Sequence, residues 1–117
     1  MPCVLIVEDD DDVREMLAML LRSESYEVMT ATNGAEALNA MRQRRPCLVL
    51  LDLMMPVMNG WDFRRLQLSD PELADVPVIC LTAVFDPARV AEELSVRCFR
   101  KPVALDDVLS EVAAACG

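Results

Sequence analysis

The chain has 117 residues, of which 54% are hydrophobic, and it fits one domain with one packed core. Twenty acidic and eleven basic residues give a formal net charge of −9, so nucleic acid and anionic membrane surfaces would repel it. No apolar run is long enough to cross a membrane, and no charged-then-apolar leader precedes the first strand. We therefore expect a single domain over residues 1–117 that contacts neither nucleic acid nor membrane.

In chain order the hydrophobic pattern alternates between two periods. Short, nearly continuous apolar runs indicate strands covered on both faces, and apolar residues at helical spacing indicate helices. The pattern predicts strands at residues 3–7, 26–31, 47–51, 76–81 and 96–100. It predicts helices around residues 13–21, 34–43, 60–68, 87–95 and 105–116, so that each strand is followed by a helix.

This alternation predicts an α/β fold with a parallel sheet, helices on both faces and right-handed crossovers. The first, third and fourth strands are almost purely apolar and should be central. The second and fifth contain Glu27, Arg97 and Arg100 and should lie at the edges. The resulting strand order is 2-1-3-4-5, a flavodoxin-like three-layer sandwich with five strands and five helices. Ligands in such folds bind beyond the carboxyl ends of the strands, between the first and third.

Charged and polar residues follow the strands at this edge. Glu8 and Asp9 follow the first strand, Asp52 the third, Thr82 the fourth and Lys101 the fifth. Three converging carboxylates favour a bound cation, and oxygen ligands without histidine or thiolate favour Mg²⁺. A metal, a lysine and a hydroxyl around one aspartate predict a site for phosphoryl transfer, with the aspartate as a possible acceptor.

Two other charged clusters are expected to be structural. Residues 10–12 are three aspartates that should cap and charge the start of the first helix, where anions complement the helix dipole. Arg42, Arg44 and Arg45 precede Pro46 and should lie at the negative end of the second helix.

The cysteines indicate a reducing compartment. The chain has five cysteines, which form no Cys-x-x-Cys motif. Any disulfide scheme leaves one of them unpaired. Four of them lie in or beside predicted strands, where cysteine acts as a small buried hydrophobe. The chain has no histidine, so zinc binding is not expected. We expect a cytoplasmic protein. The five are Cys3, Cys47, Cys80, Cys98 and Cys116.

Four ordered motifs, VLIVEDD, LVLLDLMMPVMNG, VICLTA and RKP, resemble the receiver domain of two-component response regulators over essentially the whole chain. The resemblance implies a signalling switch rather than an enzyme. Asp52 would accept a phosphoryl group from the phosphohistidine of a sensor histidine kinase or a histidine phosphotransfer protein. Asp9 would bind Mg²⁺ directly, Glu8 through water, and Asp52 and the backbone carbonyl of Met54 would be further ligands.

The resemblance also implies roles for the residues around the acceptor. Thr82 would hydrogen-bond one phosphoryl oxygen after activation, and Lys101 would pair with another. The bond between Lys101 and Pro102 would be cis, which is largely a property of proline. Pro56 and Gly60 would shape the loop that follows the acceptor.

Two features depart from the family pattern. Cys98 stands three residues before Lys101, where members usually carry Tyr or Phe, and Phe99 should point to the opposite face. The segment from Thr82 to Lys101 is shorter than usual by roughly one helical turn, so the helix within it should be short or displaced. The output partner is left open by the sequence.

Three other functions compete with the phospho-acceptor switch. A phosphatase of the haloacid-dehalogenase type would need an aspartate two residues after the nucleophile, where Met54 stands. A flavin carrier would need a phosphate-binding loop after the first strand, where Glu8 and Asp9 would repel the cofactor. A pseudo-receiver that acts only as a protein-interaction module is the best alternative, because Cys98 and the short segment suggest an altered output.

Overall fold

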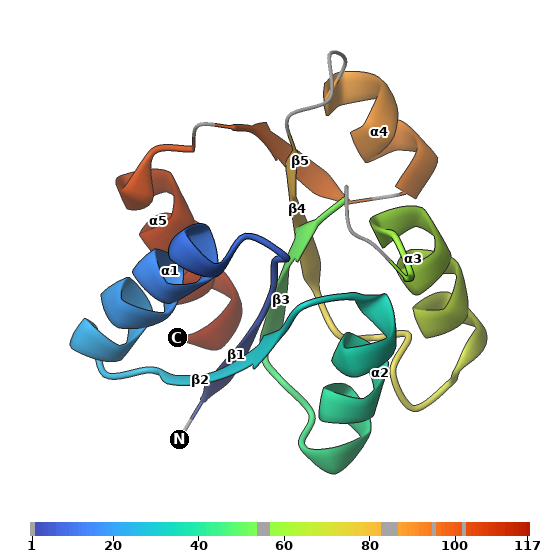
Figure 1. Cartoon of the computed structure of the whole chain (residues 1–117), viewed down its shortest axis with the longest axis horizontal. Helices are drawn as coiled ribbons and strands as arrows, with labels where there is room; N and C mark the ends of the chain where they lie inside the picture. Colours follow the sequence, from blue (N-terminus) through green and yellow to red (C-terminus); the bar gives the residue numbers. More distant parts are fainter. Residues whose placement is uncertain (1, 54–56, 83–86, 95, 102) are drawn as a thin grey trace.

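The protein was characterised as a computed structural model, which describes residues 2–53, 57–82, 87–94, 96–101 and 103–117. Strands and helices alternate along the chain, and each of the predicted elements is present (Figure 1). In chain order they are β1 (Cys3–Val7), α1 (Asp11–Ser23), β2 (Glu27–Ala31), α2 (Gly34–Gln43), β3 (Leu48–Asp52), α3 (Gly60–Ser69), β4 (Val78–Thr82), α4 (Pro87–Leu94), β5 (Arg97–Arg100) and α5 (Leu105–Cys116).

The strands form one parallel sheet in the order β2-β1-β3-β4-β5, which confirms the predicted topology. All residues of β1, β3 and β4 are buried, whereas β2 and β5 are partly exposed. The difference between pure and mixed apolar runs therefore identified the central and edge strands correctly, because only central strands are covered on both faces.

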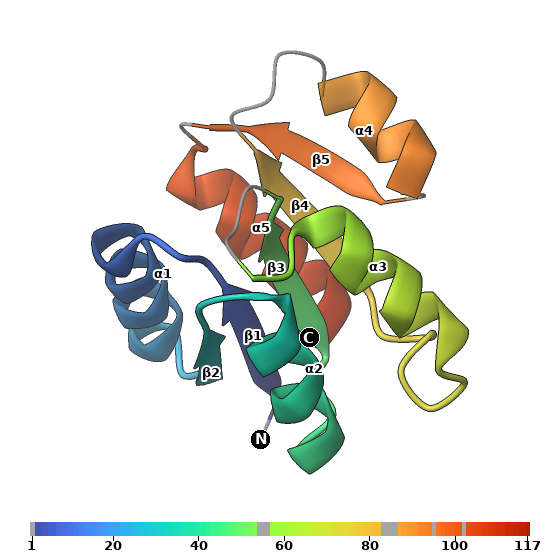
Figure 2. The same cartoon turned by 45° about the vertical axis from the view of Figure 1, so that its right-hand side comes forward.

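Helices cover both faces of the sheet, and each face has its own apolar layer (Figure 2). Side chains alternate along β1, so Leu5 and Val7 pack toward α2, α3 and α4, and Val4 and Ile6 pack toward α1 and α5. Both layers run along the sheet, and the carboxyl ends of the strands lie at one common edge. None of the helices in the described part of the chain is long and apolar enough to cross a bilayer.

Side-chain caps determine where three of the helices begin. Asp10 accepts hydrogen bonds from the backbone N–H groups of Asp12 and Val13, and Asn33 and Asn59 cap α2 and α3 in the same way. Each cap satisfies backbone donors that have no partner within the helix. The expectation that the aspartates after Asp9 start the first helix is confirmed.

Two of the three central strands, β3 and β4, begin later than predicted, whereas β1 begins at Cys3 as expected. Cys47 and Val76 are apolar but precede the paired parts of β3 and β4, since hydrophobicity alone does not show where the ladder starts. The turn before β4 is instead held by Gln67, whose amide donates to the carbonyls of Leu73 and Val76 at 3.0 Å each. The shift makes Asp52 and Thr82 the last residues of their strands.

The expectation that the four cysteines in or beside strands act as small buried hydrophobes is wrong for Cys47. Cys47 and Cys116 form a disulfide with a Cα–Cα distance of 5.4 Å, although 69 residues separate them in sequence. Cys3 and Cys80 are buried free thiols, and Cys98 is a half-buried one, as expected.

Val57 is the strained residue of the loop before α3. Its φ of +66° places a β-branched residue in the left-handed region, and 87% of it is exposed, so little burial offsets the strain. We predict that Val57→Asn raises the free energy of unfolding by about 1 kcal/mol, since asparagine tolerates this conformation. Urea unfolding measures the change. Val57→Thr keeps the branch and should give no gain, and an unchanged Val57→Asn variant would refute the strain.

Candidate functional site

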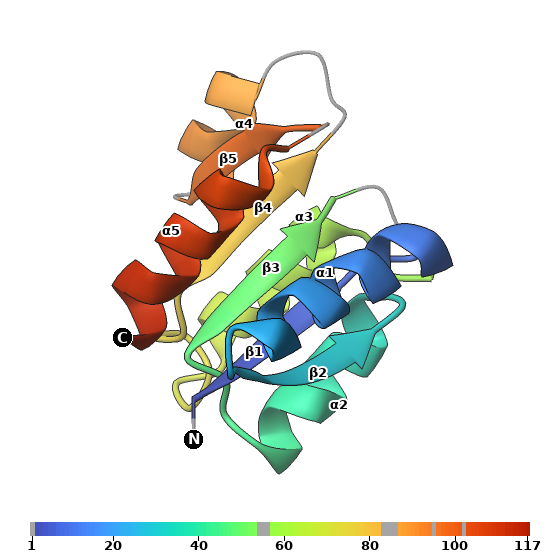
Figure 3. The same ribbon diagram turned by 90° about the vertical axis from the view of Figure 1, so that its left-hand side faces the viewer.

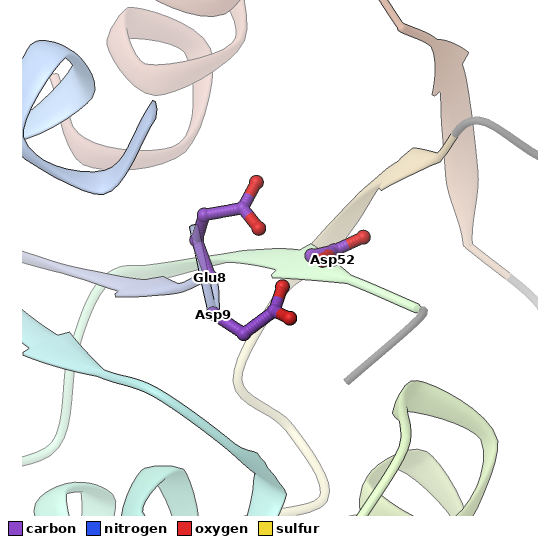
Figure 4. A group of neighbouring side chains, drawn as sticks. All are labelled: Glu8, Asp9 and Asp52. Atoms are coloured by element: carbon purple, nitrogen blue, oxygen red, sulfur yellow. The ribbon is translucent and has the colours of Figure 1, made fainter. Parts of the chain in front are cut away.

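Three carboxylates meet at the carboxyl edge of the sheet (Figure 4). Glu8 and Asp9 follow β1, and Asp52 ends β3, which is the strand next to β1. Each offers an oxygen atom, and these atoms lie within 4.8 Å of one another. Glu8 and Asp52 are buried and Asp9 is exposed, so this acidic cluster opens to solvent on one side.

Backbone contacts fix the position of Glu8. Its N–H continues the sheet by donating to the carbonyl of Ala31 at 3.0 Å, and its carbonyl accepts from the Arg14 guanidinium at 3.0 Å. Glu8 is 2% exposed, and a buried carboxylate is costly unless a positive partner accompanies it.

Lys101 supplies that partner. Its Nζ lies 2.6 Å from Oε1 of Glu8 and 3.4 Å from Oδ1 of Asp52. Burial lowers the pKa of Lys101, but the hydrogen bond to Glu8 and the charge of Asp52 outweigh that effect, so the pKa lies above the ordinary lysine value. Lys101 therefore carries its full charge at neutral pH and links the two buried carboxylates.

The charge balance of the cluster fits a divalent cation. Three carboxylates around one ammonium leave two negative charges without a cation among the residues of the cluster. All the available donors are carboxylate oxygens, which are hard ligands of the type that Mg²⁺ takes. Met54, the predicted source of a carbonyl ligand, lies outside the described residues.

Thr82 lies at the same edge of the sheet. It ends β4, it is fully buried, and its carbonyl accepts a 2.7 Å hydrogen bond from the backbone N–H of Lys101. The register places Asp52 beside Leu81, so Thr82 lies one residue beyond that pair. The structure thus brings Thr82 and Lys101 together with the acidic cluster, while Pro102 lies outside the described residues.

Gly60 is the first residue of α3 and lies where a side chain would not fit. Its N–H donates to the carbonyl of Leu53 at 3.0 Å. An added Cβ would lie 2.4 Å from Cδ2 and 2.8 Å from Cα of Leu53. The start of α3 therefore contacts the backbone directly after Asp52. Pro56, the other residue expected to shape this loop, lies outside the described residues.

Cys98 and Phe99 point to opposite faces, as predicted. Cys98 packs against the layer that contains α4, and Phe99 against the layer that contains α1 and α5. Cys98 is opposite Cys80 in the β4–β5 register, and burial raises the pKa of both thiols. The helix before β5 is short, as expected: α4 has eight residues and is the shortest helix in the described part of the chain.

Arg14 is the site residue that sequence reasoning missed. Besides the carbonyl of Glu8, it contacts the carboxylate of Asp11 within the first turns of α1. Its place on α1, six residues after Glu8, gave no periodic or motif signal. It holds the start of the helix against the acidic cluster.

A family model decides the relationship of this chain to known proteins. The response regulator receiver domain matches residues 4–113, which is most of the chain. The chain belongs to this family. Its α/β sheet, strand order and acidic strand ends are those of a receiver domain, and the resemblance seen in the four motifs is confirmed.

Relatives support the same relationship. This receiver domain is 44% identical over 87 residues to "DNA-binding response regulator MtrA" of Mycolicibacterium smegmatis. The match covers 74% of this chain and 37% of that protein, so this chain corresponds to little more than a third of the relative. "Transcriptional regulatory protein AfsQ1" of Streptomyces coelicolor is 38% identical, with 71% and 36% covered.

Solved structures have the same fold along nearly the whole receiver domain. The chemotaxis response regulator CheY4 of Vibrio cholerae superimposes with a TM-score of 0.87, 27% identity and 98% coverage of both chains. The Mn²⁺-bound form of response regulator Rcp1 gives a TM-score of 0.78 at 26% identity, covering 97% of this chain and 91% of that one.

The contacts of Lys101 give a stability prediction. Lys101→Met leaves Glu8 buried without its cation, so we predict a loss of about 2 kcal/mol in the free energy of unfolding. Adding Glu8→Gln should recover much of the loss, because the unpaired charge is then absent. Urea unfolding in a chelator measures the cycle. Two losses that simply add would show that the ion pair does not couple these residues.

The pKa of Lys101 also predicts a pH dependence. A folded-state pKa above the unfolded value means that the stabilisation is fully present below pH 10.5 and is lost as the pH rises through the raised pKa. The stability difference between the wild type and Lys101→Met should therefore be constant at neutral pH and shrink at alkaline pH. A difference that grows above pH 10.5 would contradict this sign.

Proposed function

We propose that this receiver domain is a phospho-acceptor switch in which Asp52 takes a phosphoryl group from a phosphohistidine. The donor would be a sensor histidine kinase or a histidine phosphotransfer protein. The observation that supports this role is the position of Asp52: its carboxylate shares the strand edge with Glu8 and Asp9 and lies 3.4 Å from the ammonium of Lys101. Membership of the receiver family supports it independently.

The transfer is a displacement at phosphorus. A carboxylate oxygen of Asp52 forms the new O–P bond, and the P–N bond to the donor imidazole breaks, its electron pair leaving with the imidazole. Lys101 would neutralise charge on the phosphoryl oxygens, and the hydroxyl of Thr82 would donate a hydrogen bond to one of them. Covalent attachment to a carboxylate is an established form of nucleophilic catalysis.

Asp9, Glu8 and Asp52 would hold Mg²⁺, with the Met54 carbonyl as a further predicted ligand. The geometry that supports this is the set of three carboxylate oxygens within 4.8 Å, and the similar response regulator Rcp1 has been solved with Mn²⁺. When bound, the ion would supply positive charge for the phosphoryl oxygens as negative charge builds up on them. Asp9, the exposed member, would hold the side of the site that faces the donor.

Phosphorylation would change which groups Lys101 contacts. The phosphoryl oxygens on Asp52 compete with Glu8 for its ammonium, and its backbone N–H is bonded to the carbonyl of Thr82. A shift of Lys101 would thus move the ends of β4 and β5 together and bias an existing equilibrium between two packings of the α4 side. Because Cys98 stands in place of an aromatic ring, a movement of Thr82 would be passed on to a small side chain and not to a ring.

The domain itself would contact proteins rather than DNA. MtrA is named a DNA-binding regulator, but its match to this chain covers 37% of its length. A net charge of −9 disfavours DNA contact by this domain. We further propose a cytoplasmic location, where the kinase domain that phosphorylates this domain would also lie. We also propose that the domain is a switch and does not turn over a separate substrate.

A pseudo-receiver that binds partners without phosphorylation is the second candidate. Two observations favour it, the half-buried Cys98 at the usual aromatic position and the eight-residue α4. Both features lie on the side of the fold formed by α4 and β5, whereas the acidic cluster and Lys101 are complete among the described residues. The two candidates differ in whether Asp52 becomes phosphorylated.

Phosphorylation by acetyl phosphate with Mg²⁺ tests the proposal. Intact-mass spectrometry should show one phosphoryl group on the wild type, none on Asp52→Asn, and none when a chelator replaces Mg²⁺. Asp75→Asn is the matched control, since Asp75 is exposed and lies before β4 at the opposite edge of the sheet, and it should be modified like the wild type. Incorporation that persists in Asp52→Asn would remove Asp52 from this role, and an unmodified wild type would favour the pseudo-receiver.

A further inference from the structure

The disulfide between Cys47 and Cys116 joins two parts of the fold that lie far from the acidic cluster. Cys47 directly precedes β3, and Cys116 is the last residue of α5. Figure 3 shows the C-terminal end of α5 beside the start of β3. The acidic cluster lies at the other end of β3, roughly 16 Å along a five-residue strand. The Cα–Cα distance of 5.4 Å suits a bridge without backbone movement.

The bridge attaches the last turn of α5 to the start of β3. Val112 is fully buried against the sheet, but Ala113, Ala114 and Ala115 are exposed. Cys116 follows Val112 by four residues, so it is the next side chain on the inward face of the helix. Without the disulfide, this turn would have one half-buried side chain against the core.

The two bridged cysteines are also accessible to solvent, unlike most of the other thiols. Cys47 and Cys116 are half-buried, whereas Cys3 and Cys80 are buried. Burial raises the pKa of Cys3, Cys80 and Cys98, which keeps these three as unreactive thiols. Among the free thiols of the described residues, Cys98 alone is half-buried like the bridged pair, and it serves as the control below.

Cys47 is held in place whether or not the bridge is closed. Its backbone N–H donates to the carbonyl of Cys3 at 2.8 Å, and its Sγ lies 3.2 Å from the same oxygen. Its partner Cys116 is the last residue of α5, where the three preceding residues are exposed. One sulfur anchored beside the sheet and one at a helix end suit a bond that opens and closes without disturbing the sheet.

We propose that Cys47 and Cys116 form a reversible thiol–disulfide site that exchanges with low-molecular-weight disulfides such as oxidised glutathione and fastens the end of α5 when oxidised. One cysteine thiolate attacks a glutathione sulfur, forms a mixed disulfide and releases one glutathione thiolate. The second cysteine attacks the protein sulfur of that mixed disulfide and releases the other. The protein loses two electrons and two protons, and oxidised glutathione becomes two molecules of glutathione.

Disulfides in reducing compartments are mostly transient and redox-sensing, which agrees with this exchange. The bridge closes at the opposite edge of the sheet from Asp52. Its state sets the order of the last turn of α5 and leaves phosphoryl transfer unchanged. The inference therefore does not depend on whether Asp52 is phosphorylated.

The experiment equilibrates the whole chain at a series of ratios of reduced to oxidised glutathione, traps free thiols by alkylation and maps the cross-linked peptides by mass spectrometry. We expect the Cys47–Cys116 peptide to change from reduced to cross-linked within the series and to change back when the ratio is reversed. Cys116→Ser should abolish the cross-link. Cys98→Ser, which removes a half-buried thiol outside the pair, should leave it intact.

Two measurements on the wild type report the effect on α5 and do not depend on a variant folding. The cross-linked form should melt about 10 °C higher than the reduced form. Amide exchange in residues 113–117 should be about tenfold or more faster after reduction, with the acidic edge unchanged. A bond that stays closed at every glutathione ratio, a bond that never forms, or equal exchange in both states would overturn the proposal.

Discussion

The contact of Lys101 with two buried carboxylates is the interaction on which the functional edge depends. Its ammonium lies 2.6 Å from Glu8 and 3.4 Å from Asp52, and these two side chains are almost fully removed from water. One cation balances part of the charge, and the remaining negative charge lies beside exposed Asp9. The protein thus keeps a compact site with an excess of negative charge, which favours the binding of a divalent cation.

The sheet is what makes this crowding possible. Parallel neighbours β1, β3, β4 and β5 all end at one edge, so residues separated by up to ninety-three positions become neighbours. Apolar layers cover both faces of the strands. The free energy gained by burying them offsets the cost of packing like charges at the strand ends. At the opposite edge, the disulfide between Cys47 and Cys116 fastens α5 to the start of β3. The acidic cluster and the disulfide therefore lie at opposite ends of β3.

The sequence predicted the strand order and the acidic cluster correctly because each of these patterns has one physical interpretation. Apolar runs on both faces distinguish central from edge strands, and carboxylates directly after such strands can only lie at the sheet edge. Strand starts were less certain, since Cys47 and Val76 are apolar without belonging to the ladder. The disulfide was not predicted because its partners lie 69 residues apart, one before a strand and one at a helix end. Arg14 was missed because its contact with Glu8 is to a backbone carbonyl, which no side-chain pattern encodes.

The most direct test of the central claim is thermal unfolding with Mg²⁺ and with a chelator at matched ionic strength. Mg²⁺ should stabilise the wild type, by about 2.7 kcal/mol at one hundred times the dissociation constant. Asp9→Asn should lose most of this gain, yet melt higher than the wild type in chelator because one repelling charge is gone. Asp12→Asn, a change at an exposed aspartate of α1, should keep the gain. A wild type whose Tm does not change with Mg²⁺, or an Asp9→Asn variant that melts lower than the wild type in chelator, would contradict the account.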